Sequence, residues 1–384
     1  MIVNLALSSQ PTPTPSSASG QSVTPLELFF DLVFVFTITQ LTSLLAKDPT
    51  LTGFVQMVLI FGNVWWMYGG YAWLTNVVPP RELGVRLLLL VGMGGFLVVA
   101  LAIPTAFAGG GLAFGLGYLV VTLVHTGVFL RTTQQSAVKA VLALGPFNLT
   151  TAGLLVVAGL VSGPARWLLF GAGFVLHWFT PVFARPSGFQ VRSAHFVERH
   201  GLILLIAIGE SVVAVGIGLG TIALPAGRIA TALLGLALAA GLWWLYFNGE
   251  AETAERSMER APFEERSWLA LNAFGYVFLL ILGGIVLVAA GMKLAVVRYD
   301  QSATTATAVF LAGGVAAYAI GLALFRGVLH TGSLRIRLGI GTLALPTIWL
   351  GLAFTPVIQI SALVLILIVG SILDGMTGRR RALT

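Results

Sequence analysis

Two carboxylate residues lie inside long apolar stretches of the sequence, where charged side chains are rare. Glu210 stands nine residues from either end of the otherwise uncharged stretch 201–219 within the run 199–220, and Asp31 stands seven residues past Thr24 in the run 26–46. At 1.5 Å per residue, these positions are roughly 13 Å and 10 Å inside a helix. Intramembrane acids commonly mark an ion pathway or a proton relay. A protonated carboxyl that hydrogen-bonds a neighbouring helix is the structural alternative.

Asp31 has polar residues that could work with it. Thr42 lies eleven residues further on, which is three helical turns, and therefore shares its helix face. An arginine at the predicted inner boundary, such as Arg86 or Arg199, is a candidate partner for the carboxylate. With such a partner, Asp31 would have a structural role.

Glu27 has a ready structural explanation at the start of the same helix. Thr24 as N-cap, Pro25 at the first helical position and Glu27 at the third make a capping box, in which the carboxylate also complements the helix dipole. The alternative is an acid in an inner vestibule, one helical turn from Asp31.

A run of charged and titratable residues, Glu198-Arg199-His200, precedes the predicted helix that holds Glu210. As a functional group it would form a charged entry point, with His200 the side chain most suited to titrate near neutrality. As a structural group it would fix the depth of the helix at the membrane interface. Arg199 and Glu210 are eleven residues apart, roughly 16 Å along a helix, which is too far for a direct pair.

The elements that position these residues follow from the composition. Of 384 residues, 57% are apolar and 9% are charged, and the mean hydropathy is +0.96. A soluble domain has about 25% charged residues, so the composition predicts an all-α, polytopic integral membrane protein. A transmembrane β-barrel would alternate polar and apolar residues, whereas these runs are apolar throughout.

The sequence lacks the patterns of an enzyme. It has no cysteine, and it contains no P-loop, no His-Glu-x-x-His and no Gly-x-Ser-x-Gly pattern. We therefore expect no enzyme activity, no cofactor, no metal and no nucleic-acid partner. The lipid bilayer is the expected partner, and an ion or small-molecule substrate and an oligomer are left open.

Twelve apolar runs predict twelve transmembrane helices, the last two of which are divided at Thr355-Pro356. A Ser-, Thr- and Pro-rich stretch, 1–24, predicts a disordered tail, and 376–384 predicts a basic cytoplasmic tail. The predicted helices cover 26–46, 52–77, 86–107, 111–130, 138–162, 165–183, 199–220, 227–247, 267–292, 304–326, 335–354 and 356–373.

The distribution of basic residues predicts the orientation. If both termini are cytoplasmic, sixteen of the 21 Lys and Arg residues fall in inside segments and five in outside segments. This is the bias that the positive-inside rule describes, and it accounts for the net charge of +7.

The chain shows signs of two tandem six-helix units, 25–185 and 186–375. Trp65-Trp66 followed by Tyr68 recurs 178 residues later as Trp243-Trp244 followed by Tyr246, and Arg86 matches Arg266 at an offset of 180. Two copies of an even number of helices share their orientation, which places the axis that relates them along the membrane normal. Such a repeat predicts Asp31 and Glu210 at equivalent depths. Aromatic belts at the inner boundary are the alternative explanation of the tryptophan pairs, Trp66 and Trp244 included.

The stretch from Glu27 to Leu41, ELFFDLVFVFTITQL, resembles the signature of the bacterial low temperature requirement protein A family. Further matches are Trp65-Trp66, Glu198-Arg199-His200-Gly201, Gly209–Val215, Trp243–Phe247 and Gly284–Gly291, so that the resemblance covers about 25–375. It implies a multi-pass protein of the bacterial cell membrane and assigns no reaction.

The chain departs from that family at two positions. Val-Val-Pro-Pro follows Asn76 where members carry an Asp, and Phe278 stands where many have a His. A mechanism that needs this His as a proton carrier is therefore not expected. Two hypotheses remain: a proton-linked transporter or channel that uses Asp31 and Glu210, or a non-transporting membrane protein that supports growth in the cold or membrane integrity.

Overall fold

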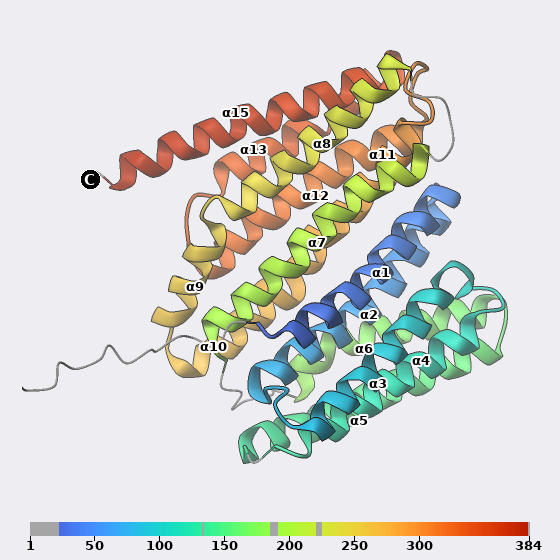
Figure 1. Cartoon of the computed structure of the whole chain (residues 1–384), viewed down its shortest axis with the longest axis vertical. Helices are drawn as coiled ribbons and strands as arrows, with labels where there is room; N and C mark the ends of the chain where they lie inside the picture. Colours follow the sequence, from blue (N-terminus) through green and yellow to red (C-terminus); the bar gives the residue numbers. More distant parts are fainter. Residues whose placement is uncertain (1–22, 133, 185–190, 220–224, 383–384) are drawn as a thin grey trace, which may run out of the picture.

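A computed structural model describes residues 23–132, 134–184, 191–219 and 225–382, and in these ranges the chain forms helices and no strand. Two groups of helices lie side by side (Figure 1). The first group is α1 (Pro25–Lys47), α2 (Leu51–Val77), α3 (Leu83–Ala102), α4 (Gly111–Phe129), α5 (Gln135–Leu160) and α6 (Pro164–Ala184). The second group is α7 (Ser193–Leu219), α8 (Ala226–Phe247), α9 (Glu250–Arg260), α10 (Phe263–Ala270), α11 (Phe278–Ala295), α12 (Thr305–Leu329), α13 (Arg335–Ala344), α14 (Thr347–Ala353) and α15 (Pro356–Ala382).

Eleven helical segments of the described chain are long and apolar enough to cross a membrane. The predicted span 165–183 corresponds to α6, which has 21 residues but is not one of the eleven. The predicted division at Thr355-Pro356 is confirmed, because α14 ends at Ala353 and α15 begins at Pro356. Most of the predicted tail 1–24, and the side chains from 378 onward, lie outside the described residues.

Local sequence signals set the helix ends. Thr24 caps α1 with the predicted capping box, and Thr50 and Thr304 accept hydrogen bonds from the backbone N–H groups at the starts of α2 and α12. Gly249 has φ of 111°, a left-handed conformation that glycine adopts without a steric penalty, and it separates α8 from α9. The charged helix that follows this glycine is α9, on which Glu252 and Arg256 pair at 3.7 Å.

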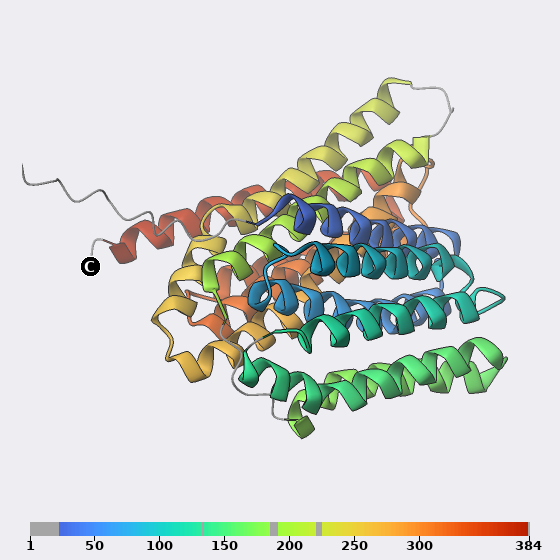
Figure 2. The same ribbon diagram turned by 60° about the horizontal axis from the view of Figure 1, so that its bottom comes forward.

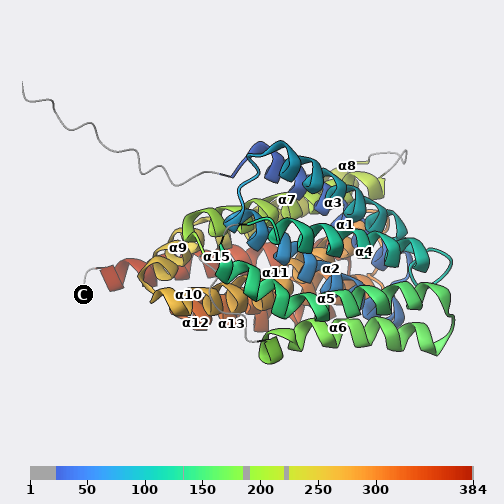
Figure 3. The same cartoon turned by 90° about the horizontal axis from the view of Figure 1, so that it is seen from below.

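The two groups meet along α1, which packs against α7 and α11 of the second group as well as against α2 and α3 of its own. In the views of Figures 2 and 3, α6 lies at the edge of the first group. We call the end of the bundle at which α1 and α7 begin the basic end, because the α2–α3 and α4–α5 connections at this end carry Arg81 and Arg131. The candidate site residues lie along the α1–α7 contact.

Candidate functional site

An ion pair buried in the bundle joins α1 to α7. Arg199 Nη2 lies 3.1 Å from Asp31 Oδ1, and the two side chains are 1% and 0% exposed. The hydroxyl of Tyr68 on α2 donates a hydrogen bond of 3.0 Å to the same carboxylate oxygen. Of the two partners that the sequence offered for Asp31, Arg199 is therefore the one observed. Arg86 is exposed and donates to the carbonyl oxygen of Pro80.

Glu27 combines its two predicted roles. As the third residue of α1 it completes the capping box, accepting hydrogen bonds of 2.9 Å from the backbone N–H and the hydroxyl of Thr24. Its carboxylate is also buried against α7, 3.1 Å from His195 Nε2 and 3.5 Å from Arg199 Nη1. Asp31 and Glu27 therefore lie in one group, which with Arg199 and His195 we call the α1–α7 cluster.

The guanidinium of Arg199 is held on several sides. Its Nη1 donates to the hydroxyl of Thr75 and, at 3.4 Å, to the carbonyl oxygen of Tyr71. Its central carbon lies 5.3 Å from the ring centroid of Phe30 and 5.7 Å from that of Tyr68, at distances typical of cation–π contacts. The three helices α1, α2 and α7 thus converge on one buried cation.

Hydrogen bonds fix the form of His195. The Oδ1 atom of Asn76 accepts a hydrogen bond of 2.9 Å from the backbone N–H of Arg192. The Nδ2 group of Asn76 is therefore turned toward His195, and it donates to His195 Nδ1 at 3.3 Å. An Nδ1 atom that accepts a hydrogen bond carries no proton, so that Nε2 carries the proton and donates it to Glu27. The network therefore suits a neutral imidazole with its proton on Nε2.

Glu210 lies in a separate polar region, further along α7 from the basic end. It is buried beside Thr39 of α1 and Lys293 of α11, and Lys293 Nζ donates 3.2 Å to the hydroxyl of Ser43. We call Thr39, Ser43, Glu210 and Lys293 the Glu210 group. The expectation that Asp31 and Glu210 lie at equivalent depths is wrong, because Asp31 contacts Arg199, eleven residues or roughly 16 Å before Glu210 on the same helix.

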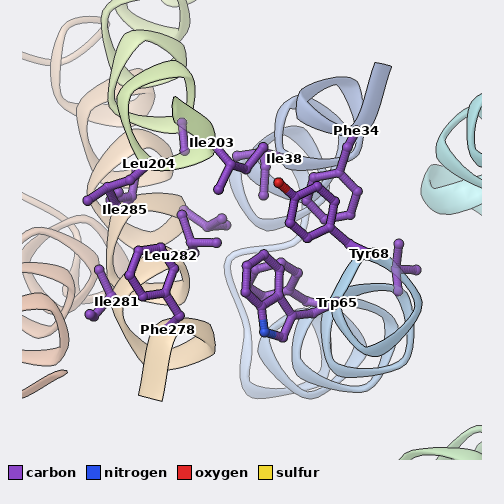
Figure 4. Packing of buried hydrophobic residues seen from close by; sticks show 14 of the residues in the cluster. Phe34, Ile38, Trp65, Tyr68, Ile203, Leu204, Phe278, Ile281, Leu282 and Ile285 are labelled. Carbon is purple, nitrogen blue, oxygen red and sulfur yellow. The ribbon is translucent and has the colours of Figure 1, made fainter. Parts of the chain in front are cut away.

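Apolar side chains fill the space between the α1–α7 cluster and the Glu210 group. Figure 4 shows side chains of α1, α2, α7 and α11 facing one another across this region. All of those that it labels are buried: Phe34, Ile38, Trp65, Tyr68, Ile203, Leu204, Phe278, Ile281, Leu282 and Ile285. The Tyr68 hydroxyl lies at the boundary of this apolar section, because it bonds Asp31.

The remaining predicted residues lie apart from the α1–α7 cluster. Glu198 is exposed and accepts a hydrogen bond of 3.2 Å from the backbone N–H of Val23. His200 is buried among aromatic rings, and its Nδ1 contacts the carbonyl oxygen of Phe196 at 2.8 Å. Its expected role as a titrating entry-point residue is not favoured by this apolar setting. Thr42 is buried, and its hydroxyl has no partner in the described part of the chain.

The aromatic residues correct the expectation of an inner belt. Trp65 and Trp66 lie in the middle of α2, which continues to Val77, and Trp65 is 1% exposed. Trp66 Nε1 donates 3.0 Å to Asn148 Oδ1. Trp244 is half exposed near the end of α8, as a belt residue would be, whereas Tyr246 is fully buried.

Sequence reasoning missed His195, Thr75 and a second buried ionic cluster. In that second cluster Arg326 binds Asp374 with two hydrogen bonds of 2.9 and 2.7 Å and binds Glu250 Oε1 at 2.7 Å. Arg337 Nη2 lies 3.0 Å from Glu250 and 3.1 Å from Asp374.

The sequence contains a signal that could have identified His195: His195 and Arg199 have the same i,i+4 spacing as Glu27 and Asp31. No group of His, Asp and Glu residues in the described ranges could hold a metal ion.

Comparison with known proteins places the chain in a family. Over 301 residues, it is 26% identical to an uncharacterized protein of Rhizobium meliloti (strain 1021), covering 75% of this chain and 73% of that protein. No solved structure matches it. The family model described as bacterial low temperature requirement A protein (LtrA) matches residues 22–372. This match spans nearly the whole chain and agrees with the resemblance of its first helix. The chain therefore belongs to the bacterial low temperature requirement A protein (LtrA) family.

Proposed function

We propose that this protein is a transporter or channel in which the α1–α7 cluster binds and releases a proton. The charge count of the buried side chains carries the proposal. Glu27 and Asp31 supply two carboxylates and Arg199 one guanidinium, and the hydrogen bonds of His195 suit its neutral form. Counted over these buried side chains alone, the cluster is one positive charge short of neutrality; the half-buried Arg192, which precedes α7, is a further cation that interacts electrostatically with Glu27. A proton or another small cation would supply that charge in a site shielded from water.

The second ionic cluster provides an internal comparison. Glu250 and Asp374 face Arg326 and Arg337, so that two acids meet two arginines and the charges balance. A purely structural cluster has this composition. The excess negative charge of the α1–α7 cluster is therefore a property of that site rather than a general feature of buried charges in this protein.

The arrangement along α1 and α7 supports a route between two polar regions. Along α1 the buried Phe34 and Ile38 stand between Asp31 and Thr39, and along α7 the buried Ile203 and Leu204 stand between Arg199 and Glu210. Near the Glu210 group, the buried hydroxyls of Thr42 and Ser211 have no partner in the described part of the chain. Unpaired buried polar groups are costly in a protein interior, and bound water or an ion can satisfy them.

The proposal includes twelve membrane-spanning helices in two tandem repeats, with α6 as the twelfth span. The packing of the two groups supports it. In the first group α3 packs on α1 and α4, α5 on α4 and α6, and α6 on α2. In the second group α11 packs on α7 and α12, the α13–α14 pair on α12 and α15, and α15 on α8.

Glycine contacts agree with this correspondence. A Cβ atom on Gly95 of α3 would lie 3.0 Å from the carbonyl oxygen of Gly117 on α4. A Cβ atom on Gly284 of α11 would lie 2.7 Å from the carbonyl oxygen of Gly314 on α12. Both crossings thus depend on a glycine pair, which is the usual device for close helix contacts in membranes. Following the positive-inside rule, we place the basic end and both termini in the cytoplasm of a bacterial cell.

Proton flux into proteoliposomes tests the proposal without knowledge of a further substrate. A pH-sensitive dye is enclosed, and a potassium gradient with valinomycin drives protons inward. We expect flux from the full chain, at least tenfold less flux from Asp31→Asn, and less flux from Glu210→Gln. Glu252→Gln is the control, because the Glu252 side chain is 81% exposed on α9. Equal flux from all variants, or flux no greater than in protein-free liposomes, would contradict the proposal.

A non-transporting membrane protein is the second candidate. It is favoured by the cross-group position of Arg199, which ties α7 to α1 and α2 as a structural fastener would. In that case Asp31→Asn should leave growth in the cold intact wherever the variant accumulates to a normal amount. Loss of cold growth at a normal amount of folded protein would count against this second candidate. We propose no enzyme activity for either.

A further inference from the structure

A cavity of about 560 Å³ lies between the two groups of helices, away from the α1–α7 cluster. Its walls come from α2, α4, α5 and α6 of the first group and from α10 and the following π-helical turn, Leu271–Val277, of the second. Single π-helical turns are rare in proteins, and those that occur are often located at functional sites. This one is fastened to the first group, because Trp65 Nε1 donates 2.7 Å to the carbonyl oxygen of Gly275. The Tyr276 hydroxyl likewise donates 2.9 Å to the carbonyl oxygen of Trp178.

Aromatic rings dominate the lining. Five of the nine tryptophans of the chain face this cavity, together with Phe129 and Tyr276. The tryptophans are Trp65, Trp66, Trp73, Trp178 and Trp268. A wall of this composition offers ring faces to a flat apolar body, and the negative face of an indole ring attracts a cation.

The charged residues of the lining indicate which sign of charge an apolar ligand of this cavity should carry. Glu264 is the one charged side chain among the lining residues, and it is exposed, so that it stands at the open side. No Lys or Arg lines the cavity, although the chain as a whole has a net charge of +7. Aromatic walls with a single carboxylate and no competing cation are complementary to an organic cation.

Asn148 adds a polar contact deeper in the wall. Its side chain is 4% exposed, and its Oδ1 accepts the hydrogen bond of Trp66. Its Nδ2 group donates no hydrogen bond to any described residue, and the nitrogen atom is not fully enclosed by the protein. The amide therefore offers a free donor to whatever fills the cavity, which marks the position of an acceptor atom on the ligand body.

We propose that this cavity is a binding site for an apolar organic cation, whose aromatic or aliphatic body lies against the tryptophans and whose positive charge lies near Glu264. The site involves both groups of helices, as substrate sites of repeat-built transporters do. Binding itself requires no transport and can be measured on the protein alone.

Two probe ions of nearly equal size and shape but opposite charge test this proposal. Tetraphenylphosphonium is the cation and tetraphenylborate the anion, and equilibrium dialysis measures the binding of each to the purified full chain in detergent, with protein-free micelles as the blank. We expect saturable binding of about one tetraphenylphosphonium per chain and at least tenfold weaker binding of tetraphenylborate. Equal binding of the two ions, or no binding above the blank, would overturn the proposal.

A neighbouring acid supplies the matched control. Glu265 is exposed like Glu264 and adjacent to it, but it does not line the cavity. Glu264→Gln should weaken tetraphenylphosphonium binding by about fivefold, the upper range for one partly exposed charge, whereas Glu265→Gln should leave it unchanged. The same weakening in both variants would show that only the general surface charge acts. The proton-flux result is independent of this measurement, so that either proposal can fail without the other.

Discussion

Arg199 on α7 lies 168 residues after Asp31 on α1 and places its Nη2 atom 3.1 Å from that carboxylate. Glu27 and His195, which are in contact, are also 168 residues apart in the sequence. The same separation holds between the first residues of the two helices, Pro25 of α1 and Ser193 of α7. Under the proposed repeat, each pair joins equivalent positions of the two halves. The α1–α7 cluster would then lie close to the axis that relates the halves, where a change in their relative position directly alters these contacts.

Removal of the cation from this cluster should be more harmful than removal of one acid. Arg199→Gln leaves two buried carboxylates without their guanidinium, and loss of one partner of a buried pair costs about 3–5 kcal/mol. Asp31→Asn leaves Glu27 and Thr75 as partners of Arg199 and should cost less. Thermal unfolding in detergent measures both. The double variant Asp31→Asn/Arg199→Gln should be more stable than the sum of the single effects predicts, and strict additivity would argue against direct coupling.

The two roles of Glu27 can be separated by substitution. Gln at the third helical position can still complete a capping box, so Glu27→Gln keeps the hydrogen bonds with Thr24 and loses only the charge that faces His195 and Arg199. Thr24→Ala instead removes the cap, which costs about 1 kcal/mol. We therefore expect Thr24→Ala to lower stability with proton flux retained, and Glu27→Gln to change flux. Identical behaviour of the two variants in both measurements would mean that Glu27 serves the helix end alone.

The second ionic cluster should prove structural. Glu250→Gln leaves Arg337 and Arg326 to share the single carboxylate of Asp374 in a buried setting, and we expect a loss of several kcal/mol in unfolding free energy. The control is Glu252→Gln on the same helix, whose exposed pair with Arg256 contributes at most about 1 kcal/mol. Proton flux per folded molecule should be unchanged in Glu250→Gln. A variant that keeps its stability but loses flux would assign this cluster to transport instead.

Much of the helix arrangement could be predicted from sequence, because an apolar run of this length has few alternatives in a bilayer. The interruptions were harder to place. The last part of α2 holds Tyr71, Thr75 and Asn76, which lower the hydropathy beyond Trp66, yet the helix continues because all three are buried against other helices. The aromatic pair therefore lies inside the bundle rather than at a membrane boundary.

The site could be predicted only in part. Burial of Asp31 and the capping role of Glu27 follow from local sequence, because they depend on neighbours within one helix. The partners could not be found in the same way, since Arg199 and His195 lie 168 residues away and reach α1 only through the packing of the two groups. The tryptophan pairs suggested that equivalent residues of the two halves are 178 residues apart, which pairs Asp31 with a position next to Glu210. The first residues of α1 and α7 are instead 168 residues apart, so that Glu210 lies deeper along its helix than Asp31 does.

The helix crossings offer a final prediction with a control built into the sequence. A Cβ atom on Gly314 would lie 2.7 Å from the carbonyl oxygen of Gly284, closer than real contacts allow, so α11 and α12 must separate in Gly314→Ala. A Cβ atom on the adjacent Gly313 would meet nothing within 4 Å. We expect Gly314→Ala to lower the unfolding free energy by about 1–3 kcal/mol, as overpacking does, and Gly313→Ala to leave it equal or slightly higher, because alanine favours the helix. Chemical denaturation in detergent compares the two, and equal stabilities would show that this crossing is looser than the glycine contact implies.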